Sequence, residues 1–179
     1  KILGICGSLR KASFNRATLR AAQSLLPQGA TLEMFELEAI PIFNQDNEKS
    51  PPPPVIEFKD KIRASDAVLF ATPEYNHGVP GVLKNTIDWL SRPPGASALS
   101  AKPAGIIGAS PGMTGTARGQ SQLRQAFEFT NTYAMGQPEV LVARAHEKFD
   151  QSGTLIDEGT RRVLSEFLEA FCAWVQRFC

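Results

Sequence analysis

The stretch Ile2-Leu3-Gly4-Ile5-Cys6 is a short and almost unbroken apolar run, and Gly7-Ser8 end it. A run of this length that stops at turn residues is typical of a strand buried on both faces. The pattern then changes, because Ala17, Ala21 and Leu25 recur at the spacing of one helix face. The chain therefore opens with a predicted strand, a loop and a helix.

This strand–helix unit recurs along the whole sequence. The predicted strands cover residues 2–6, 31–37, 67–71, 104–109 and 139–142. The predicted helices cover residues 14–26, 55–62, 80–90 and 120–129, followed by a long C-terminal helix with Val163, Phe167, Phe171, Trp174 and Phe178 on one face. Short apolar strands alternating with helices form parallel sheets covered on both faces. We predict an α/β fold, a flavodoxin-like three-layer sandwich whose five-stranded parallel sheet has the order 2-1-3-4-5.

Length and net charge narrow the classes of protein to which this chain can belong. A chain of 179 residues predicts one domain, residues 1–179. The net charge of +1 gives no general argument for binding nucleic acid or an anionic membrane. No apolar run approaches the roughly 18 residues that span a bilayer, and no signal peptide is visible. Because Lys1 directly precedes the first strand, we expect a few leading residues, including an initiator Met, before it.

The three cysteines, Cys6, Cys172 and Cys179, are odd in number and irregularly spaced. This argues against a disulfide framework and against a thiolate metal site. Burial as small apolar side chains explains Cys6 and Cys172, and a reducing cytoplasm is the expected compartment. His77 and His146 lack the spacing of metal ligands, so no metal site is predicted.

Ligands of such sheets bind at the carboxyl ends of the strands, where the loops after strands 1, 3 and 4 should meet. In the first loop, Ser13 is placed to cap the following helix, and no acid follows in its first turn. Ser8, Ser13 and Asn15 offer neutral hydrogen bonds and Arg10 a charged planar fork, which favours a phosphate site. The alternative is a hydroxyl-rich turn that only caps the helix.

The second loop follows the third strand and includes Tyr75, Asn76 and two glycines, Gly78 and Gly81. An aromatic surface, an amide and close backbone approach suit a planar heterocycle. An ordinary tight connection explains the same residues equally well. His77 either touches a substrate here or is simply solvated.

The third loop contains Gly108-Ala109-Ser110-Pro111-Gly112, which matches the Gly-x-Ser-x-Gly pattern of a hydrolase nucleophile. That interpretation has a physical defect, because the residue after the nucleophile must donate its N–H and Pro111 has none. Ser110, Gly112 and Gly115 are better suited to contact the edge of a ligand. Arg118, further on, either reaches a ligand phosphate or simply begins a helix.

Three ordered motifs resemble the NADPH-dependent FMN reductases, and most nearly their chromate- and quinone-reducing branch. They are Gly7-Ser8-Leu9-Arg10-Lys11-x-Ser13-Phe14-Asn15, Thr72-Pro73-Glu74-Tyr75-Asn76, and Val79-Pro80-Gly81-Val82-Leu83-Lys84-Asn85-x-Ile87-Asp88-Trp89. The resemblance implies bound FMN, with NADPH or NADH as co-substrate, and homodimers or homotetramers. It assigns the FMN phosphate to Ser8, Arg10, Ser13, Phe14 and Asn15, and the isoalloxazine to Pro73, Glu74, Tyr75, Asn76, Ser110, Gly112 and Gly115.

The activity that the resemblance implies is a ping-pong cycle. NAD(P)H gives a hydride to FMN, and electrons then pass to a quinone, free flavin or an oxidised metal ion such as chromate. The cofactor carries this chemistry, so no side chain is assigned as catalytic. The alternative is an FMN-binding electron carrier or redox sensor without efficient NAD(P)H turnover.

Overall fold

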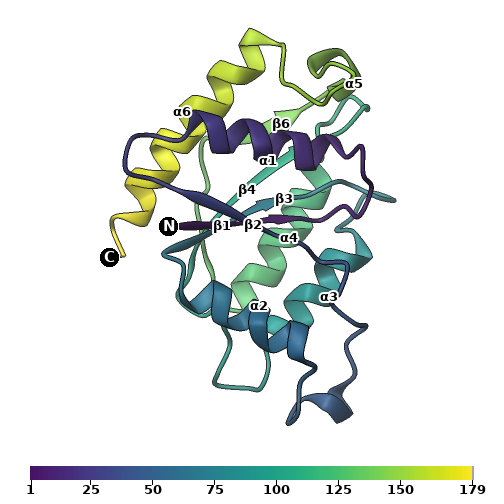
Figure 1. Cartoon of the computed structure of the whole chain (residues 1–179), viewed down its shortest axis with the longest axis vertical. Helices are drawn as coiled ribbons and strands as arrows, with labels where there is room; N and C mark the ends of the chain where they lie inside the picture. Colours follow the sequence, from purple (N-terminus) through teal and green to yellow (C-terminus); the bar gives the residue numbers. More distant parts are fainter. Residues whose placement is uncertain (179) are drawn as a thin grey trace.

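The computed structural model describes residues 1–178 as three layers, a parallel sheet between two layers of helices (Figure 1). Cys179 lies outside the described residues. The strands are β1 (Ile2–Cys6), β2 (Leu32–Phe35), β3 (Ala67–Ala71), β4 (Pro103–Ala109), β5 (Tyr133–Ala134) and β6 (Val140–Val142). Their order is β2-β1-β3-β4-β5, every pairing is parallel, and β6 also pairs with β4. The predicted fold class and strand order are confirmed.

The helices divide into two layers that enclose separate apolar cores. Helices α1 (Phe14–Leu25) and α6 (Glu158–Val175) cover one face of the sheet, and α2 (Pro53–Arg63), α3 (Gly81–Leu90) and α4 (Ala117–Phe129) cover the other (Figure 1). A short helix, α5 (Ala145–Lys148), follows β6, and a 3-10 turn covers Gln45–Asn47. All residues of β1, β3 and β4 are buried, as two-sided coverage requires.

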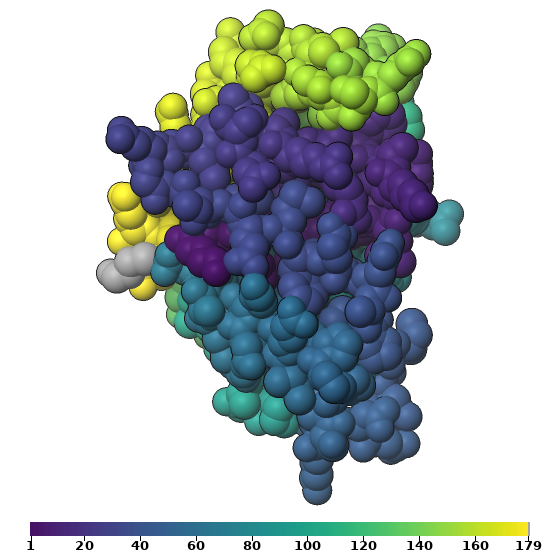
Figure 2. Space-filling view, viewed as in Figure 1, coloured from purple at the N-terminus to yellow at the C-terminus, as the bar shows by residue number. Residues whose placement is uncertain are grey.

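The connection at residues 44–52 projects from the end of the molecule beyond α2, where Figure 2 shows it in blue. Four consecutive prolines, residues 51–54, lead from this connection into the first turn of α2, which begins at Pro53. Proline suits that position because the first amides of a helix have no partner within the helix. This segment is a surface connection.

The fifth strand differs from the prediction, because it is divided in two. Pro103 and Ala104 pair with β5, whereas residues 107–109 pair with β6. Between β5 and β6, Pro138 has no N–H to donate to a ladder, so the chain leaves the sheet there. The strand predicted at residues 139–142 is present as β6, while the two-residue β5 is too short for a periodic signal.

The C-terminal helix buries a different face from the predicted one. Val163 is 38% exposed, and Phe178 lies beyond the end of α6 and is 41% exposed, so the prediction is wrong at both positions. The buried residues are Leu164, Phe167, Leu168, Phe171 and Val175. The two possible stripes share Phe167 and Phe171, which is why spacing alone chose incorrectly. Phe178 instead packs on the Tyr133 and Trp174 rings, with centroids 5.0 and 5.2 Å away.

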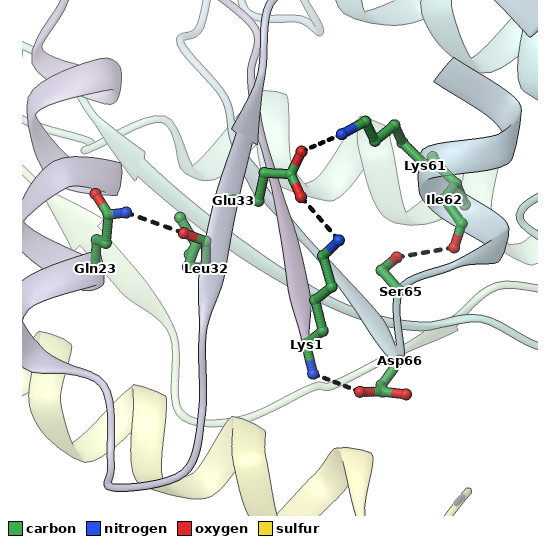
Figure 3. A network of polar contacts seen from close by, with 8 residues as sticks. All are labelled: Lys1, Gln23, Leu32, Glu33, Lys61, Ile62, Ser65 and Asp66. Atoms are coloured by element: carbon green, nitrogen blue, oxygen red, sulfur yellow. Dashed lines mark hydrogen bonds and ion pairs between the residues drawn. The ribbon is translucent and has the colours of Figure 1, made fainter. Parts of the chain in front are cut away.

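Charged side chains tie β1, β2 and α2 together at the amino ends of the strands (Figure 3). Glu33 of β2 accepts hydrogen bonds from Lys1 and from Lys61 of α2, which lower the pKa of Glu33 to about 2. These groups are exposed, and exposed ion pairs contribute little to stability. The opposite ends of the strands hold the three loops that the sequence singled out.

Substitutions in α6 distinguish the buried stripe, which contains Leu164, from the predicted stripe, which contains Val163. Leu164→Ala is expected to lower the free energy of unfolding by about 2–5 kcal/mol, because it leaves a cavity in the core. Val163→Ala is the matched control and should change it by about 0.5 kcal/mol or less, since Val163 faces solvent. Urea unfolding followed by circular dichroism measures both. A larger effect at Val163 than at Leu164 would contradict the packing described.

Candidate functional site

The three loops are held together at the carboxyl ends of the strands. The Asn15 side chain, at the start of α1, donates to the Ala109 carbonyl and accepts from the Ala109 amide, both at 2.9 Å. Backbone hydrogen bonds join Gly7 to Ala71 at 2.8 Å and Thr72 to Ile107 at 3.0 Å. The loops after β1, β3 and β4 therefore form one continuous surface.

Two polar residues of the first loop position it. Ser13 caps α1, as predicted, because its hydroxyl oxygen accepts from the Arg16 amide at 3.3 Å. Asn15 is buried, and both ends of its side-chain amide are bonded to Ala109. Ser8 is also buried, and its hydroxyl oxygen accepts from the Arg10 amide at 3.4 Å.

A hollow of about 500 Å³ lies beside the first turn of α1, lined in part by four cations, Arg10, Lys11, Arg16 and Arg20, and by one acid, Asp150, so that it is basic on balance. Arg16 is paired with Glu36. Within residues 1–178, Arg10, Lys11 and Arg20 form no ion pair, and the first turn of α1 has no acid. Free cations beside the unpaired amides of a helix start form a donor set that fits a phosphate.

The second loop is a two-residue hairpin with strained residues at its tip. Tyr75 and Gly78 exchange backbone hydrogen bonds of 3.2 and 2.9 Å. Between them, Asn76 and His77 have φ angles of 50° and 62° and are exposed. Tyr75 is half exposed, so this loop presents an aromatic surface and an imidazole to solvent.

Glu74 caps the helix that follows the third loop. Thr116, the residue before α4, has φ 74° and makes no side-chain cap. The Glu74 carboxylate accepts instead from the amides of Arg118 and Gly119, at 2.9 and 3.1 Å. Burial acts to raise the pKa of Glu74, but hydrogen bonds from Gly119 and Arg118 outweigh it and lower the pKa.

Arg118 is the second residue of α4, so it lies at the start of a helix, which is one of the two interpretations left open for it. Its guanidinium lies 3.1 Å from Glu74, and its side chain is about half exposed. Gln122, one turn further along α4, accepts from the Val79 amide at 2.6 Å. The first turns of α4 therefore hold the second loop from both sides of its hairpin.

The third loop is joined to the segment after β6. The Ser110 amide donates to Val142 at 2.9 Å, and the amides of Ala145 and Arg144 donate to Ser110 and Gly112 at 2.9 and 3.0 Å. The Ser110 hydroxyl oxygen accepts from the Gly112 amide at 3.1 Å. Helix α4 begins only at residue 117, so Ser110 does not lie on a sharp strand-to-helix turn. This geometry argues further against a hydrolase nucleophile.

Two glycines of this loop are required by close packing. A Cβ at Gly108 would lie 1.8 Å from the Thr116 hydroxyl oxygen and 2.8 Å from the Thr72 carbonyl oxygen. Gly115 has φ 54°, and a Cβ there would lie 2.4 Å from the Leu141 backbone. Gly112 is less confined, since a Cβ there would meet only the Ser110 hydroxyl oxygen, at 3.4 Å. Among these three glycines, Gly112 is therefore the one with room for a ligand to approach.

Sequence reasoning missed the buried polar residues beneath these loops, which are Thr72, Thr116 and Gln120. Gln120 donates to the Val140 carbonyl at 3.0 Å, and its own amide oxygen is buried without a hydrogen-bond partner in the part of the chain described. Glutamines at 120 and 122, in the first turns of a helix after a glycine-rich loop, were the available signal. They fasten that loop to β6 and to the hairpin.

Backbone strain is concentrated at this edge of the sheet. Six described residues other than glycine have positive φ, and four of them, Asn76, His77, Thr116 and Arg144, follow β3, β4 or β6. Such conformations persist only where surrounding structure enforces them, and they gather at functional sites. Neither a group of possible metal ligands nor a helix able to cross a bilayer occurs within residues 1–178.

Comparison with known proteins agrees with this geometry. The family model for NADPH-dependent FMN reductase matches residues 1–147. An NAD(P)H-dependent FMN reductase of Pseudomonas aeruginosa is 47% identical over 99% of this chain and 96% of its own. A quinone reductase of Pseudomonas putida is 43% identical over 96% of this chain and 92% of its own. The solved flavoenzyme NAD(P)H:(acceptor) oxidoreductase of Paracoccus denitrificans superimposes with a TM-score of 0.91 at 36% identity, over 99% and 97% of the two chains.

A doubly wound parallel sheet with loops clustered at the carboxyl ends of its strands is the architecture in which ligands generally bind at the switch point of the sheet. The chain belongs to the NADPH-dependent FMN reductase family. It is thus an oxidoreductase of a family that uses FMN together with NAD(P)H.

The cap on α4 is tested by Glu74→Gln. The neutral amide is expected to lower the free energy of unfolding by about 1–2 kcal/mol at pH 7. Because the folded state lowers the pKa of Glu74, its contribution is present above the unfolded pKa and is lost as the pH falls through the folded pKa. The difference from the unsubstituted protein should therefore shrink on acidification. Glu128→Gln is the control, because Glu128 is exposed on α4 and takes no part in the cap. An equal loss of unfolding free energy in both variants would rule out the cap.

Proposed function

We propose that this protein is an NAD(P)H-dependent FMN and quinone reductase and that its 179 residues act as one FMN-binding domain. The observation that carries the proposal is the basic hollow at the start of α1, which the first of the three clustered loops lines in part. The named relatives support the activity, since they include an FMN reductase and a quinone reductase.

The residues present fit FMN in two parts. We assign the phosphate to the first loop, with Ser8, Arg10, Ser13, Phe14 and Asn15. Arg10, Ser13 and Phe14 line the hollow, where Arg10 supplies charge and Ser13 and Phe14 form the helix start. Ser8 and Asn15 are buried beneath the same loop, which Asn15 fixes to Ala109. The ring would lie between the second and third loops, against Pro73, Glu74, Tyr75, Asn76, Ser110, Gly112 and Gly115. In this arrangement Tyr75 offers its half-exposed ring, Gly112 offers open space, and Glu74 and Gly115 hold their loops in place.

When bound, FMN supplies the redox chemistry, taking a hydride from NAD(P)H and passing electrons to a second substrate in a ping-pong cycle. The chain's part is to bind and orient both substrates on rigid loops, which removes much of the entropic barrier. Quinones are the acceptors we favour, with free flavin and oxidised metal ions such as chromate as further candidates. A homodimer or homotetramer in the cytoplasm is the form in which we propose that it works.

The phosphate position is tested with two flavins. Arg10→Ala is expected to raise the dissociation constant of FMN about 10-fold or more, because a charge-assisted hydrogen bond is lost. Riboflavin has no phosphate, so its affinity should not change. Flavin fluorescence titration measures both, and Arg63→Ala, exposed at the end of α2, is the control. Equal losses for both flavins would place Arg10 away from the phosphate.

The activity is tested by the visible spectrum of the FMN-loaded protein before and after anaerobic addition of NADPH. A yellow protein that bleaches quickly and is reoxidised by a quinone is the expected result. A yellow protein that stays oxidised would instead favour an electron carrier or redox sensor. A protein that takes up no FMN would overturn the proposal.

A further inference from the structure

The hairpin between β3 and α3 holds an imidazole on a residue with positive φ, a conformation that is uncommon for residues other than glycine. Asn76 and His77 have the two consecutive positive φ angles of a type I′ turn, whose second position strongly prefers glycine. A side chain with a Cβ crowds the following carbonyl oxygen in this region of backbone space. Histidine at position 77 therefore carries a conformational cost that glycine would avoid.

The surrounding structure enforces this turn from below. Tyr75 and Gly78 are bonded to each other, Gln122 of α4 holds the Val79 amide, and Glu74 is bound to the start of α4. These contacts fix the base of the hairpin on a rigid helix, while the tip is exposed. A strained residue presented on a braced loop is the arrangement expected of a side chain kept for function.

The His77 side chain has no hydrogen bond or ion pair within residues 1–178, so its imidazole is available. The titratable groups on its own loop are Glu74 and Tyr75, and Glu74 is bound to Arg118 of α4. On α3, Lys84 is paired with Asp88. Imidazole is the side-chain group that ordinarily changes charge between pH 5 and 8, so it suits the transfer of a proton near neutral pH.

Two-electron reduction of a quinone needs such a donor, because the quinone takes up one hydride and one proton. A quinone that gains a hydride from the reductase reaction has become a hydroquinone monoanion. Its second oxygen then takes a proton, so that an O–H bond forms as an imidazolium N–H bond breaks. Water returns the proton to the imidazole afterwards. A one-electron acceptor such as ferricyanide needs no proton.

We propose that His77 is the acceptor-binding residue of this site and that it donates a proton to an oxygen of a bound quinone. The inference rests on the proposed function, because it requires the acceptor to lie between the second and third loops. It makes the hairpin tip the element that favours quinones over acceptors that take electrons alone.

The test compares two acceptors in the FMN-loaded protein, with NADPH as donor. His77→Asn keeps a side chain that tolerates positive φ but cannot titrate. We expect the ratio of kcat/KM for 1,4-benzoquinone to that for ferricyanide to fall about 10-fold or more. The quinone kcat/KM of the unsubstituted protein should decline as the pH rises above neutral, and the variant should lose that decline.

Two further variants complete the design. His77→Gly should shift the ratio in the same way and raise the Tm by about 2–4 °C, because the strain is removed. His146→Asn changes the other histidine, which is exposed on α5, and should leave the ratio and the pH profile unchanged.

An unchanged ratio and pH profile in both His77 variants would overturn the inference while leaving the proposed function intact. The same holds if the unsubstituted protein reduces ferricyanide but no quinone. A protein that reduces neither acceptor would overturn the proposed function, and this inference would fall with it.

Discussion

The arrangement of the site depends on one buried side chain that completes the backbone hydrogen bonding of β4. Strand β3 pairs with β4 only as far as Ile107, after which the chain turns away at Thr72. The amide and carbonyl of Ala109 would then be left without partners in a buried position, at a cost of about 1–3 kcal/mol each. Asn15 supplies both partners. It thereby fixes the start of α1 to the end of the strand that leads into the third loop.

The architecture was predictable because its signals are local and repeated. Five apolar runs alternating with helical periods are enough to define a doubly wound sheet, and Ser13 was recognisable as a helix cap. Details that depend on competing tertiary contacts were not predictable from the sequence. Pro138 divides the last strand, and the exposed position of Val163 in α6 depends on how the helix is rotated against the sheet.

The motif residues show a second limit of inferring a binding site from sequence motifs alone. Asn15 and Glu74 stand within motifs that match a flavin-binding family, yet their side chains are engaged with Ala109 and the start of α4. Gly115, assigned to the same site, is confined by the Leu141 backbone. A sequence pattern does not distinguish a residue that touches a ligand from one that holds the loop around it. Distances and burial make that distinction, and they leave Arg10 and Tyr75 among the open positions.

The divided edge strand has a consequence for how copies of this chain can meet. A long unpaired edge of a parallel sheet is a template onto which another strand can add, and it favours aggregation. The edge of the sheet beyond β4 is formed by β5 and β6, of two and three residues, separated by a segment with a proline, whereas β2 forms the opposite edge. Neither piece offers a ladder long enough to recruit a foreign strand. The same interruption that makes the last strand hard to recognise in the sequence thus removes one template for edge-to-edge pairing of copies.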